Sequence, residues 1–151
     1  MMNARVDLMH VNPGVLHAML GLERQVQKAG LESRLLNLVR MRASQINGCA
    51  YCLDMHSKAL RQNGETEQRL YLLNAWRESP LYTPRERAAL GWTEALTRVA
   101  DTNAPDADYE EARRHFDDKE LVDLTTLIGM INLWNRLAIG LRYEHPAEQS
   151  T

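Results

Sequence analysis

The segment from Asp117 to Arg142 constrains the fold more than any other part of the sequence. It opens with a capping box, because Asp117 and Glu120 have the spacing at which each side chain can bond the other's backbone. Apolar residues then cover nearly the whole circumference of the predicted helix: Leu121, Val122, Leu124, Leu127, Ile128, Met130, Ile131, Leu133, Trp134, Leu137, Ala138, Ile139 and Leu141. Such a helix has to be buried on several sides. We expect either the central helix of a monomeric bundle or, with part of it left uncovered, a homo-oligomer interface.

The rest of the chain favours helices as well. Leu, Ala, Arg, Glu and Met are plentiful and β-branched residues are sparse, so the expected fold class is all-α. The 151 residues, taken as a single domain over 1–151, are enough to bury a core without metals or disulfides. Caps and apolar spacing predict further helices after Asn12 to about residue 30, and over about 31–46, 49–62, 66–76 and 109–116, with a loop at 102–106.

The clearest of the remaining helix starts is at Thr83. Pro84 follows it in the first turn, and Glu86 completes a capping box three residues after the threonine. The apolar spacing behind this start predicts a helix that buries its inner face, formed by Ala89, Trp92, Leu96 and Val99.

The charge distribution excludes some partners. The 18 basic residues are balanced by 20 acidic ones and are spread from Arg5 to Arg142, so there is no basic stripe for a nucleic acid. The amino terminus lacks the apolar run of a signal peptide, and no stretch of about 18 uncharged apolar residues suggests a membrane span. We expect a cytoplasmic protein without nucleic-acid or membrane partners, whose cysteines are normally reduced.

The chemistry in the sequence is concentrated at Cys49, Cys52 and His56. On a helix these residues share one face within two turns, and they include both cysteines of the chain. Cα atoms three residues apart on a helix lie about 5 to 6 Å from each other, which suits a disulfide that opens and closes. A helix amino terminus and an imidazolium both favour the reactive thiolate. The spacing therefore predicts a redox pair with an adjacent base.

Other interpretations of these residues are weaker. Leu53 stands where c-type haem attachment needs a histidine, which excludes that site. A structural zinc site needs a fourth ligand, and the other histidines are not at ligand spacing. Thioredoxin-type sites follow a strand, whereas both flanks here are helical. Two buried structural cysteines beside a solvated histidine remain an alternative.

The run from Leu38 to His56, LVRMRASQINGCAYCLDMH, resembles the core of the alkylhydroperoxidase AhpD-like proteins of the carboxymuconolactone decarboxylase superfamily. The resemblance continues through TPRERAAL at 83–90, ELVDL at 120–124 and INLWNRL at 131–137, and it covers about 31–142. It implies an all-α fold that assembles into trimers or hexamers. It also implies a thiol-dependent peroxidase that reduces hydroperoxides.

The same resemblance assigns roles to the pair. Cys52 is implied as the attacking thiol, Cys49 as the resolving thiol and His56 as the base. Attack on a peroxide gives a sulfenic acid on Cys52, which Cys49 condenses into a disulfide. The implied partners are a hydroperoxide substrate and an external dithiol reductant, which resets the pair by thiol exchange. No metal or other cofactor is expected.

One position departs from the family pattern. The relay glutamate of the family lies twelve residues before the first cysteine, and this position is Asn37, whose amide cannot accept a proton. Glu32, Asp54 and Glu120 are candidate substitutes. Tyr51 also replaces a histidine that some members carry between the cysteines. A slow redox-sensing or interaction protein is therefore an alternative, as is a lactone decarboxylase-like member, although that branch uses no cysteine pair.

Overall fold

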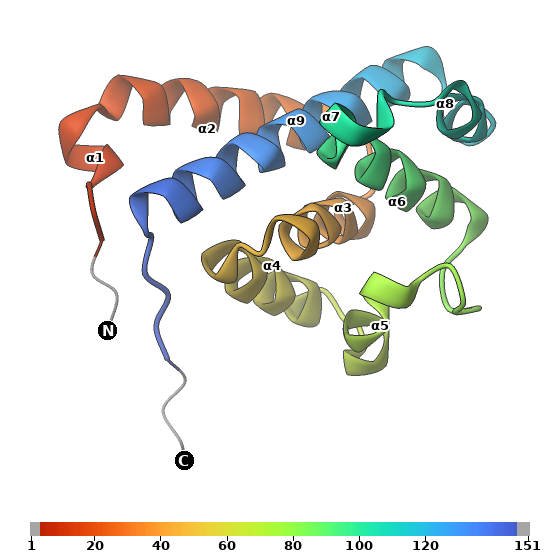
Figure 1. Cartoon of the computed structure of the whole chain (residues 1–151), viewed down its shortest axis with the longest axis horizontal. Coiled ribbons are helices and arrows are strands. Elements are labelled where there is room, and N and C mark those ends of the chain that lie inside the picture. The colour runs from red at the N-terminus through yellow and green to blue at the C-terminus, as the bar shows by residue number, and fades with distance from the viewer. Residues whose placement is uncertain (1–3, 148–151) are drawn as a thin grey trace.

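The computed structural model describes residues 4–147 and contains only helices and connecting segments over that range (Figure 1). The elements are α1 (Leu8–Val11), α2 (Pro13–Lys28), α3 (Ser33–Asn47), α4 (Ala50–Gln62), α5 (Glu67–Tyr71), the 3-10 turn η1 (Leu73–Ala75), α6 (Pro84–Thr97), α7 (Val99–Thr102), α8 (Asp106–Arg113) and α9 (Asp118–Leu141). The predicted all-α fold class is confirmed.

Helix α9 is the centre of the fold, as its apolar circumference predicts. It crosses the molecule in Figure 1 and packs against α2, α3, α4, α6 and α8. Its inward side chains include the fully buried Leu124 and Leu127. By length and hydropathy α9 alone among the described helices could cross a membrane, but its packing is that of a core helix. Val122, Leu133 and Ile139 stay exposed, so the predicted oligomer interface remains a prediction.

Side-chain caps mark the starts of several helices. Thr83 and Asp117 each form the predicted capping box, with Glu86 and Glu120 respectively. The Asn12 side chain accepts a hydrogen bond from the backbone N–H of Val15 and begins α2. These contacts satisfy backbone donors that the first helical turn leaves free.

Three predicted helices differ in their extent. The helix expected over 66–76 breaks at Leu72 into α5 and η1. The predicted burial of Val99 is wrong, because α6 ends at Thr97 and Val99 lies in the separate turn α7 with 49% of its surface exposed. Helix α8 begins at Asp106, earlier than predicted, where Asp106 and Asp108 complement the positive end of the helix dipole.

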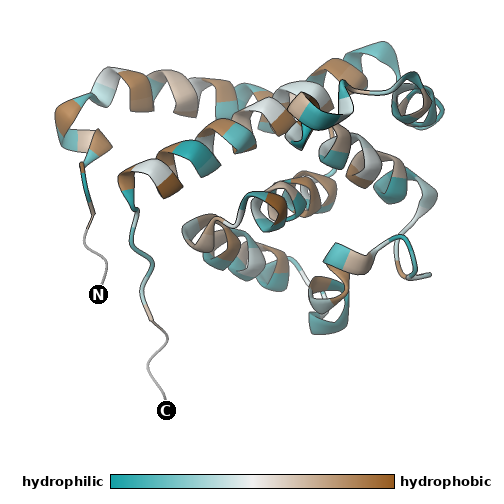
Figure 2. Cartoon of the chain, in the orientation of Figure 1, coloured by the Kyte–Doolittle hydropathy of each residue, from teal (hydrophilic) through white to brown (hydrophobic). Residues whose placement is uncertain are grey.

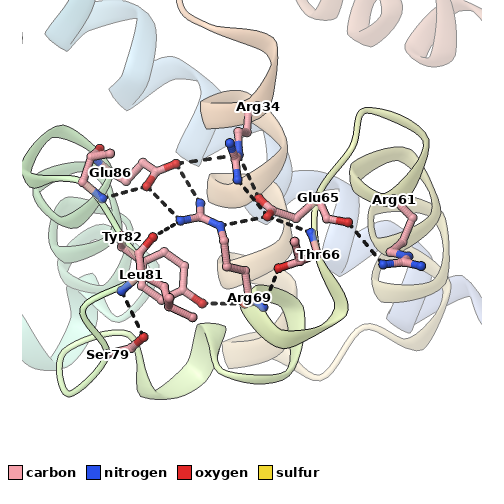
Figure 3. A network of polar contacts seen from close by, with 10 residues as sticks. Arg34, Arg61, Glu65, Thr66, Arg69, Ser79, Leu81, Tyr82 and Glu86 are labelled. Atoms are coloured by element: carbon pink, nitrogen blue, oxygen red, sulfur yellow. Dashed lines mark hydrogen bonds and ion pairs between the residues drawn. The ribbon is translucent and has the colours of Figure 1, made fainter.

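A buried ionic network joins α5 to its neighbours (Figure 3). The Glu65 carboxylate, whose side chain is 1% exposed, accepts hydrogen bonds from Arg34 of α3 and Arg69 of α5. Arg69 also donates to Glu86 of α6 at 2.8 Å. Each buried charge therefore has an opposite partner, and the network fixes the segment between α4 and α6 against α3.

The amino-terminal arm, defined here as residues 4–28, is attached more loosely. Within the described chain α2 packs mainly on α9 and on the short helix α1. The Arg5 backbone N–H donates to the carbonyl of Leu141 at 2.9 Å, which ties the start of the arm to the end of α9. Figure 2 shows apolar residues along α1 and α2. Several apolar residues of the arm remain exposed: Val6, Met9, Val11, Val15, Leu20 and Leu22.

Candidate functional site

The junction between α3 and α4 positions the two cysteines. Gly48 ends α3 in the left-handed conformation, with φ at 68°, where a side chain would be strained. Cys49 is the N-cap of α4, and its Sγ accepts a hydrogen bond from the backbone N–H of Cys52 at 3.3 Å. The pair forms a disulfide with its Cα atoms 5.3 Å apart, within the range that the helical spacing predicts.

Both cysteines are buried, but they face different surroundings. They pack against Ala138 of α9 under Tyr51 and Tyr143, whose rings meet edge to face with their centroids 5.5 Å apart. Cys52 lines a large cavity, whereas Cys49 is not part of its lining. A small molecule in this cavity can therefore contact Cys52 but not Cys49.

The cavity has a volume of about 630 Å³ and lies between the amino-terminal arm and the helices α3, α4 and α9. Its lining is predominantly apolar. The lining residues are Ala4, Val6, Asp7, Leu8, Met9, Leu16, Leu20, Glu23, Gln27, Asn37, Arg40, Tyr51, Cys52, Met55, His56, Ala59, Ile131, Trp134, Ala138, Tyr143 and Glu144. This volume and lining suit an organic molecule with a sizeable apolar part.

His56 lies in the same cavity as Cys52, one helical turn further along α4. It is 8% exposed, and its Nε2 has no hydrogen-bond partner among residues 4–147. Burial, followed by the positive charge of Arg40, lowers the pKa of His56 to about 4. His56 is therefore neutral at pH 7 and able to accept a proton, and Nε2 is not bonded to Cys52 while the disulfide is closed.

Asn37 lies in the cavity, but a carboxylate reaches the site from a different helix. Arg40 donates to Asn37 Oδ1 at 3.4 Å and also to the Glu23 carboxylate, which comes from α2. The indole N–H of Trp134 donates to the other oxygen of Glu23 at 3.4 Å. The sequence does not indicate Glu23 as a site residue, because no local spacing relates it to the cysteines.

The three substitutes suggested by the sequence lie elsewhere. Glu32 and Glu120 both pair with Arg85, at 3.0 and 2.7 Å respectively. Asp54 pairs with Lys58 one turn along α4, at 2.8 Å. None of these three carboxylates lines the cavity. The suggestion that they replace the family's glutamate is therefore not supported by their positions.

The donor set offers little to a metal ion. Over residues 4–147 no group of three or more His, Cys, Asp or Glu side chains is arranged to hold one. A structural zinc site needs about four such ligands. The groups that line the cavity beside Cys52 include the imidazole of His56 and the ion pair of Arg40 and Glu23.

The amino-acid sequence is similar to those of known proteins. The sequence matches the carboxymuconolactone decarboxylase family over residues 13–95. It is 39% identical to the uncharacterised protein YdfG of Bacillus subtilis (strain 168) over 140 residues, which cover 93% of this chain and 95% of YdfG.

The fold is also similar to those of solved structures. A protein of unknown function from Agrobacterium tumefaciens, whose suggested role is that of an antioxidant defence protein AhpD, superposes with a TM-score of 0.93. It is 49% identical, and the match covers 97% of this chain and all of that one. The debrominase Bmp8 shares the fold, with a TM-score of 0.82 at 20% identity over 92% of this chain and 75% of its own. The chain thus belongs to the carboxymuconolactone decarboxylase family, and within it to the AhpD-like members.

Proposed function

We propose that the protein is a thiol-dependent peroxidase that reduces organic hydroperoxides at Cys52 and is recycled by an external dithiol. The observation that carries this proposal is the position of Cys52: it is disulfide-bonded to Cys49, lines an apolar cavity and lies one turn from the neutral His56. The compartment that we propose is the cytoplasm, since a pair recycled by a dithiol needs a reducing environment.

The reaction begins with proton transfer from the Cys52 thiol to His56. The thiolate then attacks one oxygen of the hydroperoxide, the O–O bond breaks, and the alkoxide leaves as an alcohol after taking up a proton. Cys52 is now a sulfenic acid. The Cys49 thiolate attacks its sulfur, hydroxide leaves and becomes water, and the disulfide forms. A dithiol then supplies two electrons and two protons and becomes a disulfide itself.

The amino terminus of α4 supports the assignment of Cys49 as the resolving thiol. The N–H of Cys52 already donates to Cys49 Sγ, and the helix dipole favours negative charge at this end. Cys49 is therefore a good leaving group when an incoming thiolate attacks Cys52, the cysteine that lines the cavity.

The first test is a thiol titration with two peroxides. The reduced protein should lose both thiols on addition of one equivalent of cumene hydroperoxide. Hydrogen peroxide should react at least about tenfold more slowly, because it has no apolar part to bury in the cavity. Apolar burial worth about 1.4 kcal/mol already corresponds to a tenfold difference in affinity. Equal rates for the two peroxides would contradict the substrate class. Retention of both thiols would contradict the peroxidase function itself.

A slow redox-responsive protein is the second candidate, and Asn37 favours it. With an amide at this position and a low pKa at His56, the proton from Cys52 has no strong acceptor beside it. We expect Asn37→Glu to accelerate Cys52 oxidation by about 10²-fold, the lower end for a positioned general base. Stopped-flow measurement of thiol loss checks this, with Asn37→Gln as the uncharged control. An unchanged rate would show that proton acceptance is not limiting.

A lactone decarboxylase-like activity is the remaining alternative within the family. It would not depend on the cysteine pair, so decarboxylation of a lactone substrate should be as fast in a Cys49→Ser/Cys52→Ser double variant as in the parent. Loss of that activity together with the thiols would exclude this alternative.

A further inference from the structure

Three helices converge on the carboxylate of Glu23. The residue lies on α2, its side chain bonds Arg40 of α3, and it accepts a hydrogen bond from Trp134 of α9. Its side chain is 22% exposed and that of Arg40 is 6% exposed, so the ion pair is largely shielded from water. Ion pairs in such surroundings keep much of their electrostatic effect on neighbouring groups.

Arg40 connects this carboxylate with the redox residues. It lines the same cavity as Cys52 and His56, it donates to Asn37 at 3.4 Å, and its positive charge acts on His56. An arginine stays protonated at every pH of interest, so it cannot relay a proton. Its influence on the site is electrostatic, and it depends on how far Glu23 neutralises it.

We propose that Glu23 is a positioning residue of the redox site, which holds Arg40 in place and neutralises it, and thereby sets the charge that Cys52 and His56 experience. The carboxylate acts through Arg40 and not by taking up a proton. The inference rests on the proposed function only in treating Cys52 as the reactive thiol.

The other charged and titratable groups of the cavity have different partners. Asp7 bonds His10 at 2.7 Å, and Glu144 accepts a hydrogen bond from the backbone N–H of Ala4. Tyr51 and Tyr143 meet edge to face, and burial, followed by Tyr51 and Asp7, raises the pKa of Tyr143. Asp7 and Glu144 are exposed to solvent, which leaves the pair of Glu23 and Arg40 as the shielded ionic group of the cavity.

The test is a double-mutant cycle that removes the charges of Glu23 and Arg40 and follows Cys52, made in a Cys49→Ser background so that one thiol remains. The rate of alkylation by iodoacetamide is measured against pH. Because the thiolate is the form that reacts, the midpoint of this profile gives the pKa of the Cys52 thiol. Glu23→Gln leaves Arg40 unneutralised, which stabilises the thiolate, so the midpoint should fall by about one unit. Arg40→Met leaves the carboxylate unneutralised, so the midpoint should rise by about one unit.

The double variant and the controls make the cycle specific. Glu23→Gln/Arg40→Met removes both charges and should return the midpoint close to the parent value. Glu23→Asp keeps the charge and should also stay near it. Glu111→Gln removes an exposed carboxylate that pairs with Arg114, and should have no effect. If Arg40→Met fails to fold, Arg40→Gln removes the same charge.

The outcomes separate the inference from the proposed function. Opposite shifts that cancel in the double variant support it, even in a protein that does not turn over peroxide, because alkylation needs no peroxide. Shifts in the same direction, which structural damage would produce, overturn it. Unmoved midpoints overturn it as well, even where peroxide reduction is fast.

Discussion

Replacing Cys52 with serine should abolish hydroperoxide reduction, with a loss of about 10³-fold or more in the rate, as for other enzymes that lose their nucleophile. The physical reason is that a hydroperoxide in the cavity can reach Cys52. Cys52 lines the cavity beside His56, whereas Cys49 is buried under Tyr51 and Tyr143 outside the lining. Turnover of cumene hydroperoxide with dithiothreitol as the reductant measures the effect.

Cys49→Ser is the matched control for this variant. It should react once with the hydroperoxide at close to the parent rate and stop at the sulfenic acid, because no second thiol condenses with it. A carbon nucleophile such as dimedone should then label Cys52. The opposite pattern, with Cys52→Ser reactive and Cys49→Ser inert, would reverse the roles of the two thiols.

The largest effect on stability is expected for Glu65→Ala. The substitution removes the carboxylate that Arg34 and Arg69 share and leaves Arg69 without one of its two acidic partners. Removal of one member of a buried ionic network costs about 3 to 5 kcal/mol in the free energy of unfolding. Urea denaturation followed by circular dichroism measures the loss.

Glu67→Ala provides the comparison at the same end of α5. Glu67 pairs with Arg61 at 3.4 Å, but both side chains are about half exposed, so its removal should change the free energy of unfolding by less than about 0.5 kcal/mol. A loss in Glu65→Ala no greater than that in Glu67→Ala would mean that the network contributes nothing to stability.

The sequence predicts those features of the fold that depend on neighbours within a few residues. The capping boxes at Thr83 and Asp117, the apolar circumference of α9 and the cysteine spacing are all of this kind. Val99 illustrates the limit, because its apolar character fits the periodicity of α6 but the helix ends two residues earlier. Where a helix ends without a glycine or proline signal depends on packing that the local pattern does not contain.

The candidate site was predictable to the same extent. Cys49, Cys52 and His56 lie on one helix, so their spacing was sufficient to bring them together. Glu23 reaches them only because α2 packs on α9, and the contact joins residues 17 positions apart in sequence. Glu32 and Glu120 are equally acidic but pair with Arg85, a choice that depends on tertiary structure.

The disulfide joins two cysteines only three residues apart, so it adds little to the stability of the fold. Cross-links stabilise a fold chiefly by restricting the unfolded chain, and a ring of only four residues contributes roughly 2 kcal/mol by this effect. The core of α3, α6 and α9 does not depend on that contribution. We therefore expect reduction of the disulfide to alter the first turn of α4 and to leave the rest of the protein folded. In the proposed cycle, each of the two redox states would then keep the core intact, so that repeated turnover would not require refolding.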